Sequence, residues 1–130
     1  MIKIEVKIDD SGVLRFCKVE GHAGAGKLGE DIVCAAVSVL MDTALRVLED
    51  RKGITLRHDE PKPGILWFEA DYFDFNSEGD STIGTAGNLT GIPSSRDFLY
   101  AIGEFLLTGL KSIEEDHPHH CQLTILNKTK

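Results

Sequence analysis

The first stretch of the chain, I-K-I-E-V-K-I at residues 2–8, alternates strictly between apolar and charged side chains. A period of two is typical of a strand with one face on a hydrophobic core and the other in water. Turn-forming residues follow directly at positions 9–12, with the sequence D-D-S-G. Residues 13–20 are therefore predicted to form the return strand of a β-hairpin.

A helix is predicted over residues 32–50, with Asp31 as its N-cap and Gly53 beyond its end. Apolar side chains recur in this segment at the spacing of a helix, and they form an arc wide enough for both a sheet and a second surface, such as another subunit. The arc comprises Ile32, Val33, Ala36, Val37, Leu40, Met41, Ala44, Leu45 and Leu48.

Two further strands are predicted at residues 54–59 and 65–72, joined by a turn at P-K-P-G, residues 61–64. A capping box at residues 94–97 opens a second helix, which Pro118 ends, and residues 121–126 form a last strand. Gly109 falls on the apolar face of that helix, where it would let another element pack closely. The other residues expected on this face are Phe98, Ile102, Phe105, Leu106 and Ile113.

The predicted order ββαββαβ indicates an α+β fold: one mostly antiparallel sheet with two helices packed on it. A length of 130 residues fits a single domain over residues 1–130. Residues 73–93 are polar and rich in Gly, Ser and Thr, and they are expected to form a long loop inserted into this domain.

Composition narrows the classes of function. Hydrophobic residues make up 42% of the chain, yet no apolar run approaches the roughly 20 residues that span a bilayer, so no membrane association is predicted. Three cysteines without framework spacing indicate free thiols and a cytoplasmic protein. A net charge of −7 argues against direct nucleic-acid binding and suits a basic peptide partner.

His22 and Cys34 form the strongest candidate for chemistry. With Asp31 as the cap, Cys34 would fall in the first helical turn, where free N–H groups and the helix dipole stabilise a thiolate or an oxyanion. The glycines between the two residues permit the imidazole to fold back onto the thiol. The alternative is that Cys34 is a small core residue and His22 a solvated loop residue.

Two other motifs are weaker. G-H-A-G-A-G-K at residues 21–27 has the glycines and lysine of a phosphate-binding loop, but Leu28 stands where Ser or Thr should hold magnesium. His117, His119, His120 and Cys121 are close in sequence, but their order matches no usual zinc spacing. We therefore predict neither a metal nor another cofactor.

The segments G-H-A at residues 21–23 and G-E-D-I-V-C-A-A-V-S at residues 29–38 are similar to a known family, the bacterial ribosomal-processing cysteine proteases named Prp. The resemblance covers about residues 1–72 and 94–126. It implies that His22 and Cys34 are the catalytic dyad of an α+β homodimer. It also implies a glycine-rich loop at the substrate cleft, formed by Gly21, Ala23, Gly24, Gly26 and Gly29.

The resemblance further implies a substrate, a large-subunit ribosomal protein from which a short N-terminal extension is removed. Asp31 and Ser38 match the family motif as well. Asp31 either caps the helix or orients His22, and Ser38 either hydrogen-bonds near the thiolate or only packs. The expected function is thus peptide hydrolysis through an acyl-enzyme, the alternative being a non-catalytic ribosome-assembly or peptide-binding module.

Overall fold

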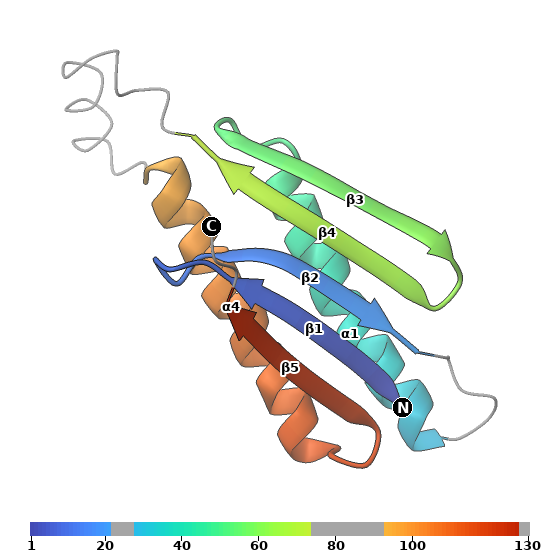
Figure 1. Ribbon diagram of the computed structural model, residues 1–130. Coiled ribbons are helices and arrows are strands. Elements are labelled where there is room, and N and C mark those ends of the chain that lie inside the picture. The colour runs from blue at the N-terminus through green and yellow to red at the C-terminus, as the bar shows by residue number, and fades with distance from the viewer. Residues whose placement is uncertain (22–27, 74–92, 128–130) are drawn as a thin grey trace, which may run out of the picture.

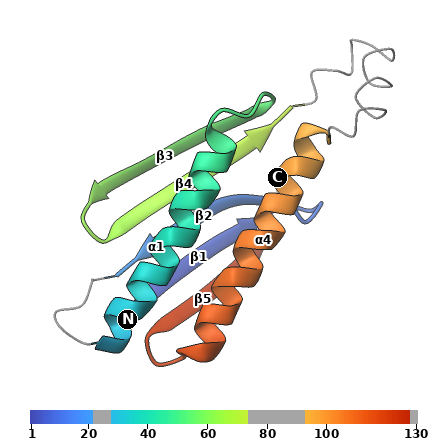
Figure 2. The same cartoon turned by 180° about the vertical axis from the view of Figure 1, so that it is seen from behind.

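The computed structural model describes residues 1–21, 28–73 and 93–127, which form one sheet and two helices (Figure 1). Both helices, α1 (Leu28–Glu49) and α4 (Ser95–Asp116), lie on the same face of the sheet (Figure 2). The strands are β1 (Ile2–Ile8), β2 (Leu14–Glu20), β3 (Ile54–Lys62), β4 (Ile65–Tyr72) and β5 (Cys121–Asn127). The predicted ββαββαβ order and the α+β class are confirmed.

The strands are arranged in the order β3-β4-β2-β1-β5. All neighbours pair antiparallel except β1 and β5, which are parallel. β4 runs in the same direction as β1 and β5, and α4 forms the crossover connection that leads the chain from β4 past β2 and β1 into β5. The alternation in β1 is reproduced: Ile2, Ile4 and Val6 are at most 2% exposed and face the helices.

Helix α1 begins at Leu28, so the predicted start at residue 32 was wrong and Asp31 is not its N-cap. The sequence pattern predicted the N-cap at residue 31, which already belongs to the first turn of α1. Acidic residues such as Glu30 and Asp31 stabilise a first turn through the helix dipole, and this offsets the cost of about 1 kcal/mol for Gly29. Cys34 therefore lies in the second turn of α1 and not in the first.

The predicted apolar arc of α1 is mostly buried. Ile32 is the exception, with 51% of its surface exposed. Val39 and Val47, which were not part of the arc, add two more exposed apolar side chains to this helix. The arc residues that are buried are Val33, Val37, Met41, Ala44, Leu45 and Leu48.

Helix α4 begins as predicted. Ser94 is its N-cap, and the Ser94 hydroxyl accepts a hydrogen bond from the backbone N–H of Asp97 at 3.1 Å. Phe105 was wrongly assigned to the core face and is 66% exposed. The buried stripe follows Leu99, Leu106 and Leu110, and one residue of helix turns Phe105 about 100° away from Leu106.

Close packing of the two helices at Gly109 is confirmed. A Cβ atom at this position would lie only 2.8 Å from Cδ1 of Leu40 on α1.

Strand β3 runs three residues beyond its predicted end, so the turn before β4 is only Pro63-Gly64. Of the predicted loop at 73–93, all but Phe73 and Pro93 lies outside the described residues. Neither helix is long and apolar enough to cross a membrane.

Candidate active site

At one end of the sheet β1 begins, β2 ends and β3 turns into β4 (Figure 1). A cavity of about 320 Å³ is lined by residues from this end of the sheet. Helix α1 forms its other wall. The apolar lining residues are Ile2, Val19, Val37, Met41, Pro63, Ile65 and Leu66. The remaining described lining residues are Gly21, Cys34, Ser38, Glu60 and Gly64. The site is therefore a mainly apolar pocket with a thiol, a hydroxyl and a carboxylate at its surface.

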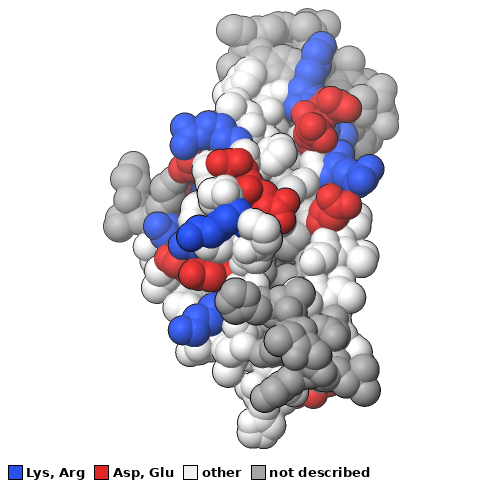
Figure 3. All heavy atoms as spheres, turned by 90° about the vertical axis from the view of Figure 1, so that its right-hand side faces the viewer, with Lys and Arg blue, Asp and Glu red and all other residues white. Residues whose placement is uncertain are grey.

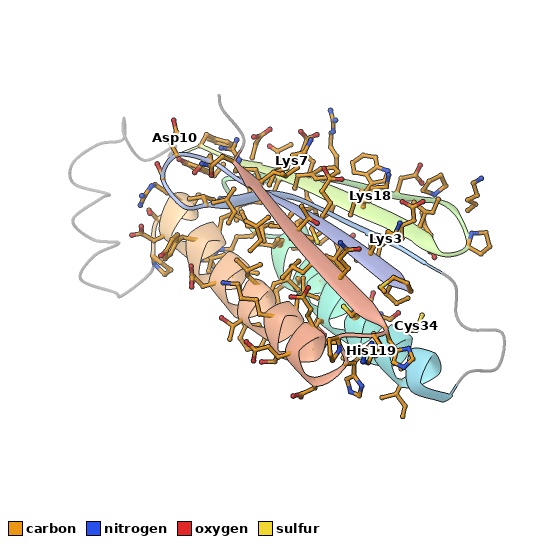
Figure 4. All side chains as sticks on the ribbon, turned by 60° about the horizontal axis from the view of Figure 1, so that its bottom comes forward. Lys3, Lys7, Asp10, Lys18, Cys34 and His119 are labelled. Carbon is orange, nitrogen blue, oxygen red and sulfur yellow. The ribbon has the colours of Figure 1, made fainter. Side chains whose placement is uncertain are left out.

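Cys34 is partly exposed and lies on the wall formed by α1 (Figure 4). Ser38, which lines the same cavity, is four residues further along the helix and so on the same side of α1. A molecule in the pocket can thus contact both the Cys34 thiol and the Ser38 hydroxyl.

The other two cysteines are buried inside the protein, Cys17 at 0% and Cys121 at 1% exposure. Burial raises the pKa of Cys17 to about 12, and its Sγ donates to the Met41 Sδ at 3.6 Å. Burial, together with the charge of Glu114, also raises the pKa of Cys121. Cys34 is therefore the cysteine that is both reachable and placed in a pocket.

Gly21 leads the chain into residue 22 from the wall of this pocket. Its backbone N–H donates to the Gly64 carbonyl at 2.9 Å, which fixes the end of β2 against the β3–β4 turn. His22 lies outside the described residues, as do Ala23, Gly24, Gly26 and most of the phosphate-loop-like segment. Gly29 and Asp31 belong to the first turn of α1, and their side-chain surroundings also lie outside the described set.

The other four histidines of the chain are all described, and none of them lines the pocket. His117, His119 and His120 lie at or beside the turn before β5, where Figure 4 labels His119. No group of three or more His, Cys, Asp or Glu side chains within residues 1–21, 28–73 and 93–127 is arranged to hold a metal ion.

Sequence reasoning missed Glu60 and the Pro63-Gly64 turn as parts of the site. No local pattern signals them, because the ends of β1, β2 and the β3–β4 hairpin meet only once β2 pairs antiparallel with both β1 and β4. The expected oxyanion donors also need correction. Cys34 is the seventh residue of α1 (counting from Leu28), and N–H groups at that depth bond to the carbonyl four residues earlier.

The fold and the pocket define an α+β protein with an accessible cysteine at a concave apolar site. This arrangement is suited to hydrolysis with the cysteine thiol as nucleophile. Comparison with known proteins specifies this class. The family described as cysteine protease Prp matches residues 1–122, and the chain belongs to this family. It is accordingly a cysteine protease, and the predicted resemblance is confirmed.

The ribosomal processing cysteine protease Prp of Staphylococcus aureus strain Mu50 is 24% identical over 123 residues, which cover 95% of this chain and 97% of the relative. A crystal structure of a Streptococcus mutans protein is 26% identical, with a TM-score of 0.67 over 98% of this chain and 96% of that one. The S. aureus Prp structure in complex with a substrate peptide has a TM-score of 0.69 at 20% identity, covering 96% and 99% of the two chains. These structures share the fold described above.

Proposed function

We propose that this protein removes a short N-terminal extension from a large-subunit ribosomal protein in the cytoplasm. The nucleophile is Cys34 and the base is His22. The observation on which this depends most is that Cys34, unlike Cys17 and Cys121, lies partly exposed on the wall of an apolar pocket. The substrate class follows from the relative in S. aureus, a ribosomal processing cysteine protease.

The reaction proceeds in two halves. His22 takes the proton from the Cys34 Sγ, and the thiolate attacks the carbonyl carbon of the scissile peptide bond. The C–N bond then breaks as His22 protonates the leaving amine, which frees the shortened ribosomal protein. Water hydrolyses the remaining thioester, with His22 as base, and releases the extension and the free thiol.

The position of Gly21 and the positions of the four described histidines support His22 as the base. Gly21 lines the pocket that contains Cys34, so residue 22 follows directly from the pocket wall. None of the four described histidines lines that pocket. A base has to come within hydrogen-bond reach of the thiol, and His22 is the histidine that directly follows a residue of the pocket wall.

Supporting roles go to Ser38 and Asp31. The Ser38 hydroxyl shares the pocket with Cys34 and is suited to donate a hydrogen bond to the thiolate. Asp31 lies three residues before Cys34 in α1, and we assign it to orienting His22. The oxyanion is stabilised by free backbone N–H groups, which in α1 belong to residues 28–31.

Exposed apolar side chains on the outer side of the helices support a homodimer. Val39 on α1 is 64% exposed and Phe105 on α4 is 66% exposed. Burying such side chains against a second copy is favourable, by about 1.5–3 kcal/mol for each that is fully covered. Light scattering after size-exclusion chromatography is expected to give a mass of twice 14.3 kDa. A monomer at micromolar concentration would contradict the dimer.

We expect no direct binding of this protein to nucleic acid. Acidic and basic side chains are interspersed on the face shown in Figure 3, and the net charge of the chain is −7. Phosphate backbones are bound by contiguous basic surfaces, which neither observation favours.

The test is cleavage of the organism's own ribosomal protein, followed by mass spectrometry. We expect one cut that removes an N-terminal extension. Cys34→Ala and His22→Ala should each reduce the rate by at least about 10²-fold, since each removes a member of the dyad. His119→Ala is the matched control and should retain the wild-type rate.

Two results would contradict parts of this assignment. Undiminished cleavage by Cys34→Ala would exclude Cys34 as the nucleophile. Binding of the ribosomal protein by the wild type without any cut would favour the non-catalytic peptide-binding module.

A further inference from the structure

We propose that Glu60 selects a lysine or arginine in the substrate peptide, at a position next to the apolar pocket. This inference rests on the proposed function, because it assigns a specificity-determining residue to the same site.

The alternation of side chains along β3 places Glu60 on the pocket side of the sheet, the side on which Ile54 and Leu56 pack against the core, and a β-bulge follows at this point. Asp59 pairs with Trp67 of β4 and Lys62 pairs with Ile65, so β3 advances three residues while β4 advances two. The extra residue is accommodated at Glu60 and Pro61. Glu60 lines the pocket that contains Cys34, whereas Pro61 lines a separate groove on the open face of the sheet. Successive side chains of a strand point to opposite faces of the sheet, which accounts for the different surroundings of Glu60 and Pro61.

Glu60 is the charged side chain among the described lining residues of the pocket. None of the ion pairs formed within the described parts of the chain involves the Glu60 carboxylate. The Glu60 backbone N–H donates to the Asp59 Oδ1 at 2.8 Å. Its carboxylate is therefore available to a ligand.

The surroundings of Glu60 match a long basic side chain. Pro63, Ile65 and Leu66 provide apolar surface in the same pocket as the carboxylate. Lys and Arg lay their methylene stems along such surface and keep the charged end in contact with water or an anion. An acidic substrate residue at this position would meet like charge, so the same carboxylate also rejects unsuitable peptides.

The experiment starts from a peptide that copies the N-terminal extension of the organism's own ribosomal protein. Each residue within four positions of the cut identified by mass spectrometry is replaced in turn by Lys, Gln or Glu. At one or two positions we expect kcat/KM to be about threefold to fivefold higher for Lys than for Gln, the range of a partly exposed ion pair. The preference should disappear in Glu60→Gln and favour Glu over Lys in Glu60→Lys.

Asp59→Asn is the matched control. It removes the neighbouring carboxylate, which lines neither the pocket nor the groove, and should leave the Lys preference intact. The preference should also decrease as salt is raised from about 0.05 to 0.5 M, because screening weakens exposed ion pairs. A Lys preference that persists unchanged in Glu60→Gln would overturn the assignment.

Binding of fluorescein-labelled peptides to Cys34→Ala, measured by anisotropy, separates this inference from the proposed function. Tighter binding of the Lys peptides that is lost when Glu60→Gln is added supports Glu60, even if the wild type cuts nothing and the peptidase proposal fails. Equal affinity for Lys and Gln peptides overturns the role of Glu60 while leaving proteolysis by Cys34 unaffected.

Discussion

Gly21 and Gly64 are in backbone contact at the wall of the pocket. The Gly21 N–H donates to the Gly64 carbonyl at 2.9 Å, and a Cβ atom on Gly64 would lie 2.6 Å from the Gly21 carbonyl oxygen. Gly64 also has a φ of +90°, which side-chain-bearing residues rarely adopt. This contact joins the residue before His22 to the β3–β4 turn, and thus to the strand that bears Glu60.

Gly64→Ala is expected to lower the free energy of unfolding by about 1–3 kcal/mol, because it combines an unfavourable φ with a backbone clash. It should also slow peptide cleavage, since relieving the clash displaces Gly21 at the pocket. Urea unfolding and kcat/KM measure the two effects. Gly12→Ala is the matched control: Gly12 has a similar φ of +85°, but its Cβ would meet only the Tyr100 ring, at 3.3 Å. Equal effects of the two variants on cleavage would contradict a role for the contact.

Iodoacetamide is expected to modify Cys34 in the folded protein and to leave Cys17 and Cys121 unmodified. Cys17 and Cys121 are at most 1% exposed, and burial raises the pKa of both thiols, so neither presents a thiolate to the reagent. Mass spectrometry of tryptic peptides identifies the labelled residue, and labelling in urea, where all three should react, is the control. Labelling of Cys17 at the rate of Cys34 in native buffer would refute the burial argument.

Ser94→Ala should destabilise the protein by about 1 kcal/mol, because it removes the acceptor for the Asp97 N–H at the start of α4. Ser112→Ala, at an exposed position within the same helix, should have no destabilising effect, since alanine favours a helix. Chemical denaturation measures both. An equal loss of unfolding free energy in the two variants would contradict a stabilising role for the Ser94 cap.

The stability of the first hairpin depends on pH through Asp9. Burial alone would raise the pKa of Asp9, but hydrogen bonds from the Val13 N–H, Arg15 and the Ser11 N–H lower it below its ordinary value of 3.8. A depressed pKa in the folded state means that the carboxylate stabilises the fold above about pH 4. This contribution is lost as the pH falls through the folded-state pKa.

We therefore expect Asp9→Asn to lower the free energy of unfolding by about 1 kcal/mol at pH 6 and by progressively less towards pH 2. Urea unfolding across this pH range is the measurement. Ser94→Ala, which removes an uncharged group, should lower the stability by the same amount at every pH. A constant difference between Asp9→Asn and the wild type would contradict the linkage to Asp9.

The strands and the class of the fold were predictable because their signals are local. The period of two in residues 2–8, the N-cap at Ser94 and the proline after α4 each act over a few residues, and all three predictions are confirmed. The boundaries and the buried faces of the helices were predicted less accurately. The start of α1 at Leu28 and the exposure of Phe105 depend on which residues the sheet and the other helix cover.

The sequence by itself determined the element order, the family and Cys34 as the candidate nucleophile, since each depends on residues close together along the chain. The tertiary structure alone decided the pocket, because its walls come from residues as distant as Ile2 and Leu66. It also decided which cysteines are buried and placed Glu60 beside the pocket. The physical reason is that burial and concavity arise only when distant segments pack, and the packing here depends on sheet pairing that no local pattern specifies.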